Sequence, residues 1–171
     1  MKQYLPVGKV VSTHGIRGEL RVHPLCDGPE FICKLKTLYW DGNGLKPVSV
    51  NHSRPHKNIA LVTLSGVETV AQADVLRGKT LYFNRDDVEL APGQYYVDDL
   101  IGLQAINADT GRQYGTLRDV SFTGANDVYH IADETGREYL FPAVPEMIEQ
   151  INLETGQILI RPIKGIFNDE N

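Results

Sequence analysis

Short runs in which apolar and polar residues alternate recur along this 171-residue chain, and most of them end at a turn that contains glycine. In residues 4–12 and 19–23, Val and Leu alternate with Lys, Arg and Glu, which is typical of strands with one buried face. Residues 38–40 and 47–51 flank Asp41-Gly42-Asn43-Gly44, a sequence suited to a hairpin turn. The chain is therefore predicted to be mainly β.

Helical spacing of apolar residues is confined to residues 68–77, which stop at Gly78. Glycine commonly ends a helix because it adopts a left-handed conformation without strain. Residues 59–64 are apolar enough for a central strand, and residues 79–83 return to the strand pattern. We therefore expect one short helix packed on a sheet in this part of the chain.

Three acidic-Thr-Gly sequences recur in the second half, and each precedes a segment of alternating apolar residues. Glycine in such a turn can take the left-handed conformation that closes a hairpin. The repeats are 25 and then 20 residues apart, which is too irregular for a solenoid. They predict a small antiparallel barrel. The three turns are Asp109-Thr110-Gly111, Glu134-Thr135-Gly136 and Glu154-Thr155-Gly156.

The formal net charge of −5 is unevenly distributed. Residues 1–84 carry eleven Lys or Arg and six Asp or Glu, a net +5, whereas residues 85–171 carry six and sixteen, a net −10. Acids, proline and glycine gather with little apolar period in residues 85–94, as at a domain boundary. We predict two domains, residues 1–84 and 95–171, with a linker at residues 85–94. Their opposite charges suggest different partners.

The sequence offers little support for export, a membrane anchor or catalysis. No stretch approaches the ~20 apolar residues that span a bilayer, and the first residues lack an export signal, so we expect a cytoplasmic protein with no membrane partner. Cys26 and Cys33 are expected to be reduced and partly buried. The motifs of serine hydrolases, phosphate loops and dinucleotide-binding folds do not occur, which favours a binding protein over an enzyme.

Zinc is the metal whose ligand types gather in the first half. The candidate ligands are His23, Cys26, Cys33, His52 and His56. His52 and His56 have the spacing of a helical ligand pair, but Pro55 lies between them and a predicted strand precedes them. Because the paired spacings of a structural zinc site occur only as fragments, we predict no metal and no cofactor.

The turn between the first two predicted strands is the strongest candidate site in the first half. Turn geometry alone explains its glycines, but it leaves His14 and Arg17 exposed at the tip, beside Lys9 and Arg21. A basic loop with free backbone N–H groups can contact phosphate. Two interpretations stay open at this point: a structural turn, and a phosphate-binding surface formed by these four residues.

Two tyrosines and two acids, Tyr95, Tyr96, Asp98 and Asp99, open the second predicted domain. In the structural interpretation one tyrosine packs into the barrel and the acids begin a helical turn, where their charge suits the N-terminus. In the functional interpretation the rigid tyrosines anchor a protein partner, and the acids face its Lys and Arg. A basic partner would complement an acidic domain.

The loop of residues 142–148 contains two prolines, which fix it in an extended form. It either covers one end of the barrel or presents Val144 and Met147 to a partner.

Four separated motifs follow one another over nearly the whole chain. They are Val7-Gly8-Lys9-Val10-Val11 with Thr13-His14-Gly15-Ile16-Arg17-Gly18-Glu19-Leu20, Tyr95-Tyr96-x-x-Asp99-Leu100-Ile101-Gly102, Thr123-Gly124-Ala125-Asn126-Asp127-Val128-Tyr129, and Pro142-Ala143-Val144-Pro145-Glu146. In this order they closely resemble the RimM family of bacterial ribosome maturation factors. The resemblance implies two small barrels: an N-terminal six-stranded β-barrel like those of translation factors, and a C-terminal PRC barrel.

The resemblance also implies a non-enzymatic assembly factor. Such proteins bind the free small ribosomal subunit, contact ribosomal protein nineteen of its head, and assist folding and processing of the small-subunit rRNA. The family's paired tyrosines, implicated in association with the subunit, correspond to Tyr95 and Tyr96. Which other side chains touch the ribosome does not follow from the motifs.

Combined with the charge distribution, the resemblance suggests a division of labour within a monomer. The acidic barrel is expected to hold the ribosomal protein and the basic barrel to contact rRNA. Two other classes remain open: an RNA-processing or RNA-modifying enzyme acting on precursor rRNA, and a PRC-barrel adaptor for some other partner. The expected protein contacts are Tyr95, Tyr96, Asp98, Asp99, Val144 and Met147, and the expected rRNA contacts are Lys9, His14, Arg17 and Arg21.

Overall fold

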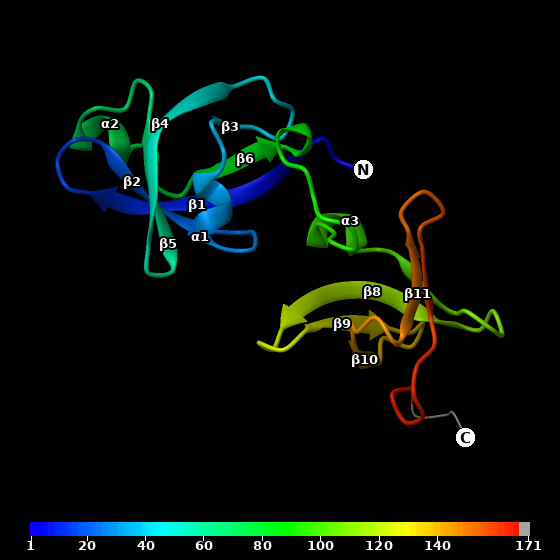
Figure 1. The fold of residues 1–171 in the computed structure, drawn as a ribbon. Helices are drawn as coiled ribbons and strands as arrows, with labels where there is room; N and C mark the ends of the chain where they lie inside the picture. Colours follow the sequence, from blue (N-terminus) through cyan, green and yellow to red (C-terminus); the bar gives the residue numbers. More distant parts are fainter. Residues whose placement is uncertain (168–171) are drawn as a thin grey trace. The chain divides into compact units, whose positions relative to one another are not determined.

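The computed structural model describes residues 1–167 and divides the chain into two compact units, the first spanning Met1–Ala91 and the second beginning at Pro92 (Figure 1). This division falls within residues 85–94, whose limits as a linker stay a prediction. No helix among the described residues has the length and apolar character needed to cross a membrane.

Six strands and three short helices make up the N-terminal unit. The strands close into a barrel in the order β1-β2-β5-β4-β3-β6, with every recorded pairing antiparallel. This confirms the expected six-stranded barrel. The elements are β1 (Tyr4–His14), β2 (Glu19–Pro24), α1 (Pro29–Cys33), β3 (Thr37–Tyr39), β4 (Pro47–His56), β5 (Ile59–Leu64), α2 (Val70–Asp74), β6 (Thr80–Asn84) and the 3-10 helix η1 (Arg85–Asp87).

The apolar alternation of the sequence becomes the inner face of this barrel. In β1, Leu5, Val7 and Val10 are buried, and the pattern shifts by one residue at a bulge between Pro6 and Gly8. Strand β5 lies between β2 and β4 and has four buried residues among its six, as predicted for a central strand. The hairpin predicted around Asp41 is confirmed by the β3–β4 pairing.

Helix α2 is present but shorter than the predicted 68–77. Thr69 accepts a hydrogen bond from the Gln72 backbone N–H, and the Gln72 side chain accepts one from the Thr69 N–H, a reciprocal cap that fixes where the helix begins. After Asp74 the backbone continues in tight turns to Gly78, which has a φ of 86°. Helix α1 was not predicted.

The C-terminal unit contains α3 (Val97–Leu100) and a six-stranded sheet in the order β10-β9-β8-β7-β12-β11. The prediction of a wholly antiparallel arrangement is wrong at one place, because β7 and β12 pair in parallel. Strands β7 and β11 were not predicted, since they are short and mix polar with apolar residues. The strands are β7 (Gln104–Asn107), β8 (Gln113–Phe122), β9 (Asp127–Ala132), β10 (Glu138–Pro142), β11 (Ile148–Asn152) and β12 (Gln157–Ile160).

The three acidic-Thr-Gly turns each close a hairpin, as predicted. Gly111, Gly136 and Gly156 have φ angles of 77°, 87° and 74° and join β7 to β8, β9 to β10, and β11 to β12. Each turn is also held by a preceding side-chain oxygen that accepts backbone N–H groups of the turn. These acceptors are Asn107, Asp133 and Asn152.

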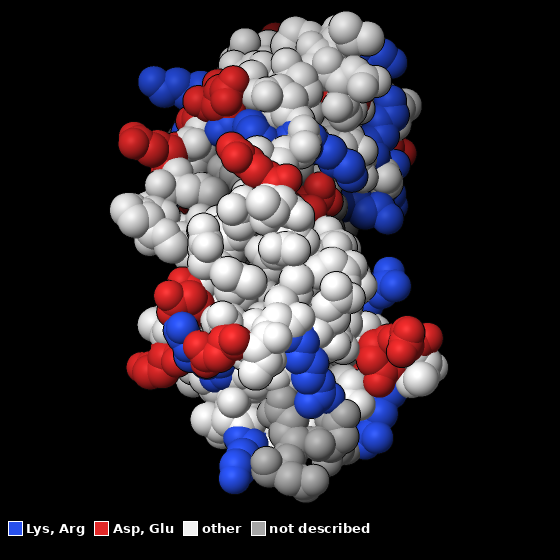
Figure 2. Space-filling view, turned by 90° about the vertical axis from the view of Figure 1, so that its right-hand side faces the viewer, with Lys and Arg blue, Asp and Glu red and all other residues white. Residues whose placement is uncertain are grey.

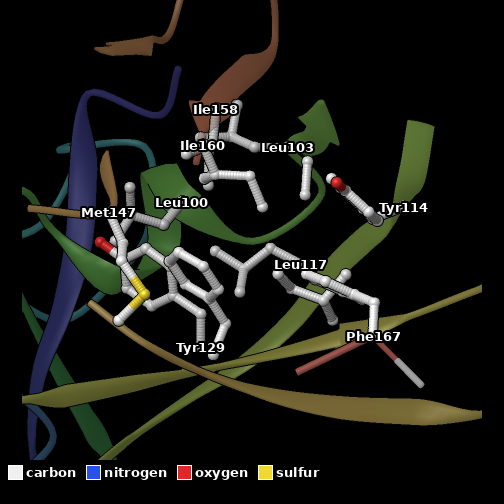
Figure 3. Close-up of a cluster of buried hydrophobic side chains, with 12 residues drawn as sticks. Leu100, Leu103, Tyr114, Leu117, Tyr129, Met147, Ile158, Ile160 and Phe167 are labelled. Carbon is white, nitrogen blue, oxygen red and sulfur yellow. The ribbon is translucent and has the colours of Figure 1, made fainter. Parts of the chain in front are cut away.

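A separate apolar core fills the C-terminal unit (Figure 3). Leu117, Phe141 and Ile158 are fully buried in it, and Tyr114 stacks on Phe167 with 4.1 Å between ring centroids. Because each unit has its own core, each has the main requirement of an independent domain.

Candidate functional site

The β1–β2 hairpin carries the candidate site of the N-terminal unit, and Gly18 fixes its shape. Gly18 has a φ of 85° and is buried, and a Cβ built there would lie 2.5 Å from the carbonyl oxygen of Val67. The hairpin therefore packs directly on the loop that follows β5. Any side chain at this position would push the two segments apart.

On the outer side of this hairpin, His14, Glu19 and Arg21 form a linked group. Arg21 Nη2 donates to His14 Nδ1 at 3.3 Å, and His14 Nε2 lies 3.8 Å from Glu19 Oε1. Because Nδ1 is the acceptor, this geometry assigns the ring proton to Nε2, which faces the carboxylate. Arg54 Nη2, from β4, donates to the same Glu19 oxygen at 3.4 Å.

His14, Glu19 and Arg54 border a surface depression at the tip of the hairpin. Arg17 is exposed there, and Ile16 is 81% exposed. The depression holds more cationic than anionic groups, as a phosphate contact requires. It is lined by His14, Gly15, Ile16, Arg17, Glu19, Arg54 and Thr63.

The structure places His14 and Arg17 in this depression, with Arg21 bonded to His14 but outside the lining, and it places Lys9 elsewhere. Lys9 is exposed further along β1, opposite His23 on one side and Thr80 on the other, and does not line the depression. Arg54 is a further residue of the site and was not predicted. The signal that could have found Arg54 was the polar and apolar alternation of β4. Strand pairing places Arg54 on β4 opposite Leu61 on β5, and it places Arg21 on β2 opposite the same Leu61.

The net charge of each unit says less about a basic contact site than the local placement of charged side chains does. Residues 1–91 carry twelve Lys or Arg and nine Asp or Glu, and residues 92–171 carry five and thirteen, giving +3 and −8. On the face that Figure 2 shows, basic side chains lie among acidic ones and form no field of one sign. The hairpin depression gathers its basic residues locally.

Helix α3 positions the tyrosine and aspartate group of the C-terminal unit. Leu100 is 3% exposed and anchors α3 in the core, while Asp98 and Asp99 occupy its first turn, as the structural interpretation predicted for the acids. Tyr96 precedes the helix and is half-buried, and Tyr95 is 37% exposed. Tyr95 is therefore the more accessible of the two rings.

Tyr95 and Phe122 are exposed aromatic side chains of the C-terminal unit. Burial raises the pKa of Tyr129 to about 12, and the nearby Asp127 and Tyr95 contribute to the rise. Asp127 pairs with Phe122, which is 71% exposed at the end of β8. Phe122 was not among the residues predicted from the sequence.

The loop after β10 covers the core rather than extending from it. Ala143 N donates to the Asp127 carbonyl, and Met147 N donates to the Val144 carbonyl, which turns Met147 inward. Met147 is 8% exposed and lies in the core cluster with Leu100 and Tyr129 (Figure 3). Its burial corrects the expectation that Met147 contacts a partner. Val144 is half-buried against the same core.

A hydrogen-bonded row of three polar side chains crosses the outer face of β8, β9 and β10. Ser121 Oγ lies 2.8 Å from His130 Nε2, and His130 Nδ1 lies 2.7 Å from Glu138 Oε1. This row was not predicted because its members are distant in sequence and meet only through strand pairing. Its residue types are those of an activated serine.

The thiols and histidines form no metal site in the part of the chain that is described. Residues 1–167 contain no group of three or more His, Cys, Asp or Glu side chains arranged to hold an ion. Cys26 and Cys33 are free thiols and half-buried, as predicted. Burial raises the pKa of both, so both are protonated at neutral pH.

Comparison with known proteins accounts for both units in sequence order. The RimM N-terminal domain matches residues 5–88, and the RimM PRC barrel domain matches residues 97–166. The chain belongs to the RimM family. The six-stranded barrel is thus the RimM N-terminal domain, and the sheet of the C-terminal unit belongs to its PRC barrel, as the motifs predicted.

RimM relatives match the chain over nearly its whole length. A protein of Symbiobacterium thermophilum named ribosome maturation factor RimM is 37% identical, with 95% of this chain and 94% of the relative covered. Its namesake in Clostridium botulinum is 34% identical over 96% and 97%. A crystal structure of a RimM protein from Pseudomonas aeruginosa aligns with a TM-score of 0.44 and 26% identity, covering 92% of this chain and 96% of that one. Family membership supports a role in ribosome maturation.

Proposed function

We propose that this chain is a monomeric cytoplasmic factor that binds the free small ribosomal subunit. It contacts ribosomal protein nineteen of the head, and it assists head assembly and processing of the small-subunit rRNA. The observation that carries this proposal is the ordered match of both domains to proteins named ribosome maturation factor. The two candidate sites, one on each unit, supply a route to two partners.

In this proposal the hairpin depression contacts rRNA through its phosphates. Arg17 and Arg54 supply charge-assisted donors, and His14 adds a ring N–H. Glu19 holds His14 and Arg54 in place through its carboxylate. Lys9 contributes from a separate part of the same barrel. Such contacts set position and orientation without reading base sequence.

The ribosomal protein is held by the C-terminal unit. Tyr95 supplies an accessible, rigid ring, and Tyr96 supports it at the start of α3. Asp98 and Asp99 add to a unit whose net charge of −8 suits a basic partner. Val144, half-buried against the core, adds an apolar contact for the partner.

Assembly assistance of this kind needs no bond to be broken. A factor that binds the correctly folded head more tightly than misfolded ones shifts the population toward it. Two contacts on one chain strengthen this bias, because the first raises the effective concentration of the second. A misplaced ribosomal protein or rRNA helix would satisfy only one of them.

Sedimentation of cell extract tests the proposal directly. The protein should travel with free small subunits and be absent from assembled ribosomes. Replacing both rings, Tyr95→Ala with Tyr96→Ala, should abolish cosedimentation and binding to the isolated ribosomal protein, whereas Met147→Leu, a core change of similar volume, should preserve both. Migration with some other complex would instead indicate a PRC-barrel adaptor.

One observation favours a second candidate, an enzyme that processes precursor rRNA: the row of Ser121, His130 and Glu138. Purified protein incubated with precursor rRNA discriminates the two. Cleavage or modification without other factors, lost in His130→Ala, would establish the enzyme. Unchanged precursor, with normal cosedimentation of the His130→Ala variant, would leave the row a structural feature of the sheet.

A further inference from the structure

A second depression of the N-terminal unit combines aromatic rings with lysines. Thr80 and Tyr82 alternate outward on β6, because Leu81 between them is fully buried. Trp40 and Lys46 lie at the two ends of the β3–β4 turn and are joined by a hydrogen bond from Trp40 N to the Lys46 carbonyl at 3.0 Å. Together with Lys79 these residues line the depression.

The ring surfaces are held in place by the backbone around them. Tyr82 pairs with Tyr39 on β3, and Gly42 lies beside its ring, so that a Cβ on Gly42 would be 3.6 Å from it. The Asp41 carboxylate accepts N–H groups from Asn43, Leu45 and Lys46 at 3.1, 3.0 and 2.8 Å, which fixes the turn. The backbone that carries the two rings is therefore preorganised, which lowers the entropic cost of binding a flat ligand.

The charge around the rings selects an anionic ligand. Lys79 Nζ lies 5.9 Å from the Trp40 ring centroid, and Lys46 is exposed at the other side of the same depression. Lys9 pairs with Thr80 across β1 and β6 and adds a third ammonium group to this face. Asp41, the carboxylate of the adjacent turn, is engaged by backbone N–H groups.

We propose that this depression binds an unpaired nucleotide of single-stranded RNA. The base stacks on Trp40 and Tyr82, and the adjoining phosphates face Lys46 and Lys79. Aromatic rings interleaved with lysines are the means by which proteins hold unstacked bases. A duplex offers no free base face to such a site. The inference rests on the proposed function only for the choice of RNA as ligand class, and it concerns a surface distinct from the hairpin depression.

Trp40 is the one tryptophan of the chain, so its fluorescence reports on this site in the full-length protein. A single-stranded RNA octamer of mixed sequence should quench it saturably, and an RNA duplex of equal length should do so much less. Tyr82→Leu should weaken binding about tenfold, and Tyr82→Phe should preserve it. Lys79→Gln should lower the slope of log affinity against log salt by about one. The matched control is Lys57→Gln, an exposed lysine in the β4–β5 turn, which should bind as wild type.

Three results would overturn the proposal. They are an unchanged Trp40 signal at saturating octamer, an equal loss in Tyr82→Phe and Tyr82→Leu, or quenching by a poly-glutamate peptide but not by RNA. Thermal melting of each variant separates loss of binding from loss of folding, and octamer anisotropy with Trp40→Phe gives a readout independent of the tryptophan. If Trp40 responds to RNA but the protein does not cosediment with small subunits, the proposed function fails and this site stands. The reverse outcome rejects only this site.

Discussion

Glu19 has an unusual position for a carboxylate at a surface proposed to bind phosphate. It contacts His14 and Arg54 while Arg17 beside it is exposed. The carboxylate therefore organises His14 and Arg54 and leaves Arg17 available for an incoming anion. Arg17 is the residue whose removal should affect phosphate binding with least effect on the fold.

We expect Arg17→Gln to weaken binding of the full chain to head rRNA and to lower the slope of log affinity against log salt by about one. A salt titration followed by anisotropy measures both. Arg137→Gln, at an exposed arginine of the C-terminal unit, is the control. If both variants behave alike, the hairpin depression is not a phosphate contact.

Two glycines of the same hairpin provide a matched test of packing. Gly15→Ala places a Cβ in open space at a φ of 70°, so its cost is the left-handed conformation alone, about 1 kcal/mol. Gly18→Ala adds the collision with the Val67 carbonyl, so we expect a loss above about 2 kcal/mol. Denaturant unfolding of both variants gives the difference. Equal losses would show that the β1–β2 turn does not press on the loop after β5.

At the scale of elements, the hairpin turns of the C-terminal unit depend on side-chain acceptors. In the β9–β10 turn, the Thr135 hydroxyl donates to Asp133 at 2.6 Å, and the backbone N–H groups of Thr135 and Arg137 donate to the same oxygen. The Thr135 hydrogen bond is the main cause that lowers the Asp133 pKa below its ordinary 3.8, against a smaller opposing effect of burial, with the backbone bonds assisting.

The lowered pKa predicts how the β9–β10 hairpin responds to acid. A carboxyl group with a lower pKa in the folded state stabilises the fold above its unfolded pKa, and this contribution disappears as the pH falls through the folded value. We therefore expect unfolding free energy to fall as the pH drops below about 3.8, and to fall less in Asp133→Asn. Unfolding curves between pH 5 and about 2 measure this. The same pH dependence in both proteins would contradict the assignment.

The features that could be predicted from the sequence are those determined by residues close together in the chain. The acidic-Thr-Gly turns were identified because glycine and its neighbours determine such a turn without help from the rest of the fold. Arg54 was missed because only the pairing of β4 with β5 brings it near Glu19. Met147 was expected at the surface because the prolines of its loop indicated an extended segment, whereas the bond from Met147 N to the Val144 carbonyl turns it into the core.

At the scale of the whole molecule, the chain consists of two units with separate cores. The residues of each core are therefore expected to stabilise only the unit to which they belong. Composition alone, with its total charge of −5, did not reveal this organisation. The uneven distribution of charge along the chain and the order of the motifs of two barrels indicated the two units.

Met147→Ala tests this independence. Truncating a buried Met should cost the C-terminal unit about 2–5 kcal/mol. Calorimetry should then show one transition moved to lower temperature and a second unchanged, and Trp40 fluorescence, which belongs to the N-terminal unit, should follow the unchanged one. A common shift of all signals would show that the two cores unfold together.

The closed barrel has one weak junction, the seam between β3 and β6. Strand β3 is three residues long and meets β6 through a single recorded pair, Tyr39 with Tyr82, whereas β1 and β6 share five pairs. Breathing motions should therefore open the barrel first along this seam, and amide hydrogens there should exchange with solvent sooner than those of the central β5. Trp40 lies next to this seam, so a ligand bound on Trp40 and Tyr82 would connect β3 with β6. Such a ligand should slow the exchange of these amide hydrogens.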